Sequence, residues 1–136
     1  MTETTAQSNA TAEAYVRFWN YGSDEQRVLG RTLFAESVTQ YAPIGVLSGV
    51  GALIDFTAQF AGHVGDYEFR TRSEPEAHHG RLRVQWVLLR GEDVFAEGTD
   101  LLLLNDAGRI ASITTFLDRA PEGFDPHAQH EGRTHR

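Results

Sequence analysis

The chain contains no cysteine and no lysine among its 136 residues. Without cysteine it has no disulfide framework, no thiolate nucleophile and no cysteine-ligated zinc. Without lysine it cannot form a Schiff base. It also lacks a glycine-rich phosphate-binding loop, and no apolar run approaches the roughly 18 residues of a membrane span. We therefore expect a cytoplasmic protein with no cofactor, no metal ion and no membrane partner.

Positive charge is scarce as well. Twelve basic residues stand against 19 acidic ones, which leaves a formal net charge of −7. The arginines are scattered and form no basic stripe, so the sequence argues against a nucleic-acid partner and leaves a small neutral or cationic ligand open. The length and a hydrophobic fraction of 40% fit one globular domain with one core.

Polar segments flank the expected domain. Residues 1–10 are rich in threonine, serine, asparagine and glutamine, and residues 119–136 are mostly polar. Because both segments offer little to bury, we expect a disordered N-terminus and a flexible C-terminal tail. The folded domain is then expected to span residues 11–118.

Three helices are expected in the first half of this domain. Tyr15, Phe18 and Trp19 lie three and four residues apart, which is typical of a helix with an aromatic face. The segment 23–26 has the spacing of a capping box, in which a serine and a glutamine side chain bond free amide groups at the start of a second helix. A third helix with an apolar side is expected over about 48–62.

After Tyr67 the apolar pattern changes to a period of two, which is typical of strands. The alternating runs are 67–72, 82–88, 94–104 and 109–117, and a short strand is expected earlier in the chain, over 38–42. Helices followed by a meander of antiparallel strands predict an α+β fold, with a cone-shaped pocket between the helices and one face of the sheet. The opposite face, which by alternation presents Phe95, Leu101 and Leu103, is expected to pack against a second copy of the chain.

Asp100 stands alone among apolar residues in the run 94–104. Alternation places it on the strand face that also carries Ala96, Gly98 and Leu102. A buried carboxylate without a partner usually takes up a proton, since burial can raise its pKa by about 3 to 5 units. Asp100 is therefore a candidate site residue, unless this face is wet or the side chain only bonds a neighbouring backbone group.

Together with the order of the elements, three segments carry a resemblance to a known superfamily: Tyr15-Val-Arg-Phe-Trp-Asn-Tyr-Gly22, Gln40-Tyr-Ala-Pro-Ile-Gly45 and Gly98-Thr-Asp-Leu-Leu-Leu-Leu-Asn-Asp-Ala-Gly-Arg-Ile110. Over about residues 11–118 the chain resembles the nuclear transport factor 2-like (NTF2-like or cystatin-like) superfamily. Within it the chain looks most similar to the SnoaL-like polyketide cyclases and the steroid Δ5-isomerases. The resemblance implies a cone-shaped barrel of a curved antiparallel sheet packed against three helices, and a homodimer.

The resemblance also implies residue roles. Tyr15 falls where the isomerases keep the tyrosine of their oxyanion hole, and Asp100 falls where they keep a protonated aspartic acid. Ala42 occupies the position before a proline at which the isomerases carry their general base, so we do not expect the steroid isomerase reaction. In the polyketide cyclases an aspartate in the sheet acts as acid or base on an activated carbon acid, and Asp100 is the candidate for that role.

The other expected substrate-binding residues are aromatic or weakly polar. Gln40 shares a strand face with Ala42 and could offer its amide to a carbonyl group, although a structural role is equally expected. Thr115 could add a hydroxyl. His63 follows the third helix near the expected pocket mouth, where a solvated helix-end histidine is the alternative. Three large aromatic side chains could line a pocket for a flat ligand or form plain core: Trp19, Phe60 and Trp86.

Three functional hypotheses follow. The first is an enzyme that binds a hydrophobic carbonyl compound and transfers a proton in a cyclisation, isomerisation or dehydration, with Asp100 as acid or base and Tyr15 donating to the developing enolate. The second is a non-catalytic ligand-binding or dimerisation module, which the absence of a base at Ala42 favours. A scaffold that uses only the outer sheet face is a third hypothesis.

Overall fold

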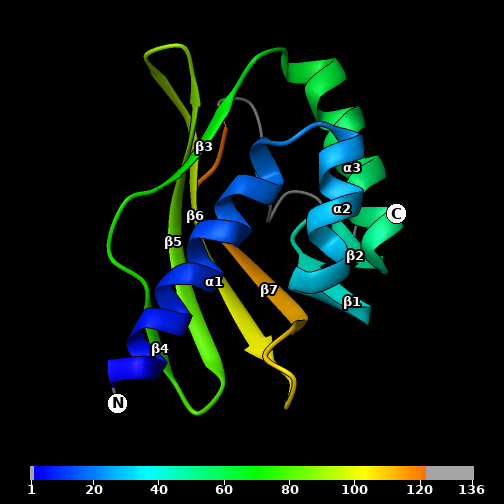
Figure 1. Ribbon diagram of the computed structural model, residues 1–136. Coiled ribbons are helices and arrows are strands. Elements are labelled where there is room, and N and C mark those ends of the chain that lie inside the picture. Colours follow the sequence, from blue (N-terminus) through cyan, green and yellow to red (C-terminus); the bar gives the residue numbers. More distant parts are fainter. Residues whose placement is uncertain (1, 122–136) are drawn as a thin grey trace, which may run out of the picture.

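The computed structural model describes residues 2–121, in which three helices pack against a sheet of seven strands (Figure 1). The helices are α1 (Thr2–Asn20), α2 (Ser23–Leu33) and α3 (Val50–Val64). The strands are β1 (Phe34–Ala42), β2 (Gly45–Ser48), β3 (Glu68–Thr71), β4 (Glu76–His78), β5 (Arg81–Arg90), β6 (Asp93–Leu104) and β7 (Ile110–Arg119). The predicted α+β class is confirmed. No helix within residues 2–121 is long and apolar enough to cross a membrane.

The sheet is mixed, with the strand order β2-β1-β7-β6-β5-β3 and with β4 paired to the first residues of β5. Within the described chain every pair is antiparallel except β1 with β7. The prediction of a wholly antiparallel sheet was wrong at this pair. The connection between β1 and β7 contains β2, α3 and four further strands, and a connection of this length allows a parallel pair. Since β2 and β3 remain at the two edges, the sheet curves but does not close into a barrel.

Two helix boundaries differ from the sequence prediction. The first helix begins at Thr2 and not near residue 11, where the folded domain was expected to start. The third continues to Val64 and ends at Gly65, whose φ of 85° is the left-handed conformation that glycine adopts at low cost. Most of the predicted flexible tail, residues 122–136, lies outside the described residues.

The predicted capping box of α2 was wrong. Gly22 precedes the helix, and no side chain bonds its free amide groups. Gln26 is instead fully buried, and its Nε2 donates to the Phe18 carbonyl oxygen at 2.9 Å and to the Thr57 hydroxyl at 3.1 Å. The side chain thus links α1, α2 and α3. The prediction failed because the local sequence at the start of α2 does not show which side of the helix faces the other two helices.

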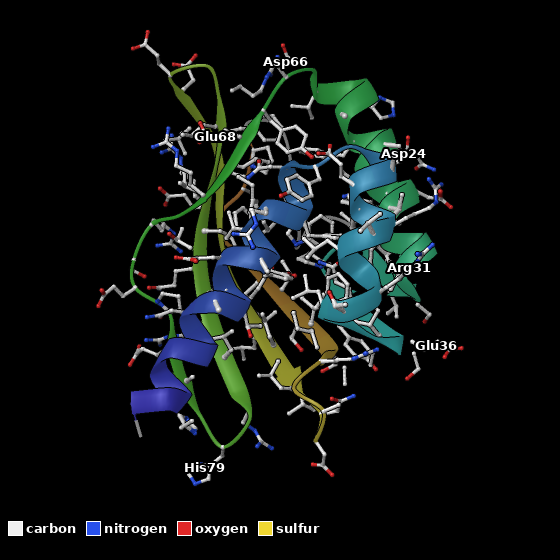
Figure 2. All side chains as sticks on the ribbon, viewed as in Figure 1. Asp24, Arg31, Glu36, Asp66, Glu68 and His79 are labelled. Carbon is white, nitrogen blue, oxygen red and sulfur yellow. The ribbon has the colours of Figure 1, made fainter. Side chains whose placement is uncertain are left out.

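The helices lie together on the concave side of the sheet (Figure 1). At one end α1 contacts β3, β4 and β5, and at the other end α3 contacts β1 and β2. The predicted aromatic face of α1 forms the centre of the core, where Phe18 packs edge-on against Phe34 at 4.8 Å between ring centroids. Charged side chains lie at the periphery, as Figure 2 shows for Asp24, Arg31 and Glu36.

One bulge changes which strand face a predicted residue occupies. The pairing of β5 with β6 shifts between Leu88 and Leu89, so that their partners are Ala96 and Val94 and Phe95 is the extra residue. Strict alternation put Phe95 on the outer face with Leu101 and Leu103, but the bulge turns it to the concave side. That part of the prediction was wrong, because a bulge leaves no clear mark in the alternation.

Candidate active site around Asp100

Asp100 lies in the middle of β6, opposite Val84 of β5 and Thr115 of β7. Its residue surface is only 3% exposed. The Tyr15 hydroxyl of α1 donates to Oδ2 at 2.5 Å, and the Trp86 indole Nε1–H of β5 donates to Oδ1 at 2.9 Å. The carboxyl group therefore faces the helices, and side chains of α1 and β5 donate to its two oxygens.

Burial raises the pKa of Asp100 above its ordinary value, because leaving water penalises the charged carboxylate. Hydrogen bonds from Tyr15, Trp86 and Thr115 lower it in part, since they stabilise that charge, but burial outweighs them. Burial, and next the charge of Asp100, raise the pKa of Tyr15 well above its ordinary value. Tyr15 thus stays protonated and remains a donor. Asp100 is the group of this pair that titrates, and it does so at a higher pH than an exposed aspartic acid.

A cavity of about 510 Å³ lies between α3, the end of α1 and the concave sheet face. This volume is within the range of small-molecule pockets. Among the described residues of its wall, Asp100 alone is charged, and seven of the side chains are aromatic. The cavity therefore suits an apolar ligand with few polar groups, placed against one carboxyl group.

Most of the predicted substrate-binding residues meet at this cavity. Its wall includes, together with Asp100, the following predicted residues: Trp19, Gln40, Ala42, Phe60, Trp86 and Thr115. Two predicted residues do not line it. His63 is exposed at the end of α3, and Tyr15 is fully buried behind Asp100.

Sequence reasoning missed several aromatic residues of the wall: Phe56, Tyr67, Phe69 and Phe95. Phe56 carried a usable signal, because it lies one helical turn before Phe60. The position of Tyr67 and Phe69 in the wall depends on a contact between residues distant in sequence. The Asn20 side chain donates to the Phe69 carbonyl oxygen and accepts from the Phe69 N–H, both at 2.8 Å. No local pattern indicates that contact.

Gly98 gives the Trp86 indole its place. The two residues are cross-strand partners, and a Cβ atom on Gly98 would lie 2.6 Å from Trp86 Cε2 and 2.7 Å from the Phe116 carbonyl oxygen. The indole ring therefore lies over the glycine, where its N–H reaches Asp100. The backbone at Gly98 thus takes part in building the site.

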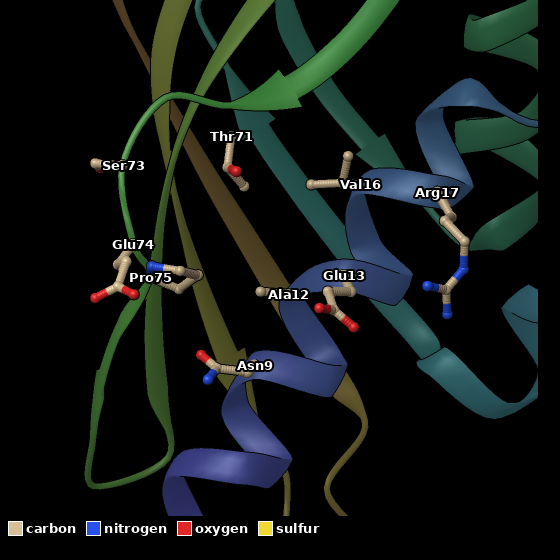
Figure 3. A pocket seen from close by; sticks show the side chains of 9 residues that line it. All are labelled: Asn9, Ala12, Glu13, Val16, Arg17, Thr71, Ser73, Glu74 and Pro75. Atoms are coloured by element: carbon tan, nitrogen blue, oxygen red, sulfur yellow. The ribbon is translucent and has the colours of Figure 1, made fainter.

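A larger hollow of about 690 Å³ lies on the surface between α1 and the segment after β3 (Figure 3). Its charged residues, Glu13, Arg17 and Glu74, are all exposed, and in Figure 3 Arg17 points away from Glu74. The hollow holds no buried titratable group. Despite its smaller volume, the cavity at Asp100 is the better candidate site.

No protein-family model matches the chain, and no curated protein matches it in sequence. Solved structures do match. A protein of the SnoaL-like family from Agrobacterium tumefaciens, proposed to be an isomerase, is 27% identical with a TM-score of 0.78, over 83% of this chain and 98% of that one.

Two further structures match at lower identity. A protein with a ketosteroid isomerase-like fold from Catenulispora acidiphila, in complex with trimethylamine, has a TM-score of 0.64 and 18% identity over 78% of this chain and 83% of that one. A protein from Sinorhizobium meliloti, proposed to be a polyketide cyclase, has a TM-score of 0.63 and 15% identity over 79% and 94%. NTF2-like and cystatin-like proteins also match. The chain therefore has the NTF2-like fold, and its structural resemblance to SnoaL-like proteins is confirmed.

We expect Gly98→Ala to lower the free energy of unfolding by about 1–3 kcal/mol, because the new methyl group displaces the Trp86 indole. The measurement is urea denaturation. Gly62→Ala is the control, since nothing lies within 4 Å of a Cβ atom at this helical position. Alanine there should stabilise by up to about 1 kcal/mol. Equal effects of the two substitutions would contradict the assigned role of Gly98.

We expect the stability difference between wild type and Asp100→Asn to depend on pH. Because the folded-state pKa of Asp100 is raised, its contribution is fully present below the unfolded value of about 3.9 and is lost as pH rises through the folded-state pKa. Wild type should therefore lose stability relative to Asp100→Asn over that window. Denaturation of both proteins at a series of pH values measures this. A difference that grows in favour of wild type with pH would refute it.

Proposed function

We propose that the protein is an enzyme of the SnoaL-like type that binds a hydrophobic carbonyl compound and transfers a proton through Asp100. The observation that carries the proposal is a buried carboxyl group with a raised pKa in the wall of an otherwise uncharged, aromatic cavity. Perturbed titratable groups in such cavities are frequent at catalytic sites. The structural neighbours proposed to be an isomerase and a polyketide cyclase support the same class.

The proposed reaction begins with ionised Asp100. The carboxylate takes a proton from the carbon between two carbonyl groups, which gives a neutral aspartic acid and an enolate. Returning the proton to another atom of the enolate is an isomerisation. If the enolate carbon instead attacks a second carbonyl carbon of the same molecule, a C–C bond forms and Asp100 protonates the resulting alkoxide. Loss of water from that product would be the dehydration.

Tyr15 has a different role in this proposal from the one the resemblance implies. Its hydroxyl donates to Asp100 and does not line the cavity. We therefore assign Tyr15 to holding the carboxylate in place, and not to bonding the enolate. As a positioning residue it fixes the oxygen that faces away from Trp86.

The substrate must be easily deprotonated, because Ala42 supplies no second base. A positioned general base contributes on the order of 100 to 10,000-fold to a rate. A carbon between two carbonyl groups needs less of this assistance than the carbon next to a single ketone. This favours 1,3-dicarbonyl compounds over simple ketones.

A binding module is the second candidate function. Both carboxylate oxygens of Asp100 are already bonded to protein side chains, and a ketosteroid isomerase-like neighbour was solved with bound trimethylamine. In this alternative the aromatic cavity holds a ligand and Asp100 fixes its orientation. It requires binding without turnover.

We expect purified protein to convert members of a 1,3-dicarbonyl series, and Asp100→Asn to lower the rate at least about 100-fold, because asparagine cannot carry the proton. Asp55→Asn, on the exposed side of α3, is the matched control and should leave the rate unchanged. Product formation is followed by absorbance and mass spectrometry. Ligand binding with no turnover by wild type would support the binding module instead.

We also propose a homodimer through the outer sheet face, defined here by Tyr41, Val46, Leu101, Leu103 and Phe116. These side chains are 39–60% exposed. They lie on adjacent strands, since Tyr41 pairs with Val46 in one direction and reaches Leu101 through Thr114 in the other. A contiguous apolar face of this kind fits self-association.

Wild type is therefore expected to be dimeric at micromolar concentration, and Leu101→Arg monomeric, because a charge would be buried in the contact. Val28→Arg, on the exposed side of α2, is the control and should remain dimeric. Sedimentation velocity distinguishes the two states. A monomeric wild type, or a dimer that persists in Leu101→Arg, would exclude this interface.

A further inference from the structure

The Gln40 side chain has a hydrogen-bond acceptor that the protein leaves unused. Gln40 is 8% exposed, and its Oε1 atom has no partner among the described residues. The side chain also belongs to the wall of the cavity that contains Asp100. Since buried polar atoms are almost always hydrogen-bonded, an orphaned carbonyl oxygen at a cavity points to a donor on the ligand.

The neighbours of the amide fix its orientation. Gln40 Nε2–H donates to Thr115 Oγ1 at 3.0 Å. Thr115 is the cross-strand partner of Asp100 and lies beside it in the cavity wall. Because Thr115 Oγ1 accepts from the amide nitrogen, that nitrogen lies on the Thr115 side. The oxygen of Gln40 is the end left for a ligand.

The rest of the wall limits the chemistry of that ligand. No basic side chain is present among the described residues of the wall, so a carboxylate or phosphate would be buried without a counter-charge. Trp19 Nε1 is the other orphaned polar atom of the wall among the described residues, but it is a donor and lies next to the Tyr15 ring. Gln40 is therefore the uncommitted acceptor beside the Asp100 and Thr115 pair.

We infer that Gln40 Oε1 accepts a hydrogen bond from a hydroxyl group of the ligand, and so selects a neutral ring compound that carries a hydroxyl beside its carbonyl group. The enol that forms when Asp100 moves a proton from the central carbon of a 1,3-dicarbonyl compound to a carbonyl oxygen has this pattern. Its new hydroxyl would lie toward β1 while the central carbon, which gave up the proton, lies toward Asp100. The inference rests on the proposed function, because it concerns the same cavity.

A matched pair of probes tests this contact: 2-naphthol, and 2-methoxynaphthalene, which lacks the donor. In fluorescence titrations with the full chain we expect wild type to bind 2-naphthol about 10-fold more tightly. Gln40→Leu should lose this preference, whereas Asp100→Asn should keep it. A preference that survives in Gln40→Leu, disappears in Asp100→Asn, or is absent from wild type would overturn the inference.

Gln40→Met is the second variant, for use if leucine disturbs β1. The methionine side chain is unbranched and matches glutamine in length, but it lacks the amide oxygen. Thermal unfolding of each variant verifies folding. Turnover separates the two proposals. Hydroxyl selection that depends on Gln40 in a protein without turnover would uphold this inference and reject the enzyme. If turnover depends on Asp100 but Gln40→Leu still prefers 2-naphthol as wild type does, the enzyme proposal is upheld and this inference is rejected.

Discussion

The hydrogen bonds to the Asp100 carboxyl group are the interaction on which the rest of the structure depends. They join α1 to β5 and β6 through Tyr15 and Trp86, across 85 residues of sequence between Tyr15 and Asp100. A hydrogen bond to a charged group contributes about 1.5–3 kcal/mol, yet burial opposes the charge that makes these bonds strong. The raised pKa of Asp100 is the outcome of that competition. The same contacts that place the first helix thus leave a protonatable group in the cavity wall.

The shape of the cavity follows from a few local features around this group. Gly98 lets the Trp86 ring lie over the strand, and the bulge at Phe95 adds an aromatic side chain on the concave side. Asn20 holds β3 against the end of α1 by two backbone bonds. These contacts enclose an aromatic space with one acid in its wall. That combination favours neutral ligands, and it makes the proton-transfer proposal chemically economical because one group serves as both base and acid.

Much of the architecture could be predicted from local pattern, because apolar residues recur in the sequence with the period of a helix or of a half-buried strand. Asp100 was found for the same reason, since one carboxylate on an apolar strand face breaks that pattern. The errors have physical causes of their own. Gln26 reads locally as a cap, but it is buried by helices distant in sequence. The parallel partner of β1, the bulge at Phe95 and the placement of Tyr15 behind the carboxyl group are likewise decided by tertiary contacts.

The central claim is that Asp100 is a buried acid with a raised pKa, bonded to Tyr15 and Trp86. The most direct test is an NMR titration of the aspartate carboxyl carbons, with the Trp86 indole N–H observed in the same samples. The account predicts that one carboxyl carbon, absent from Asp100→Asn, titrates above the range of exposed aspartates, and that the Trp86 indole N–H signal shifts with it. Titration of Asp100 together with the exposed aspartates, with no response at Trp86, would contradict the account.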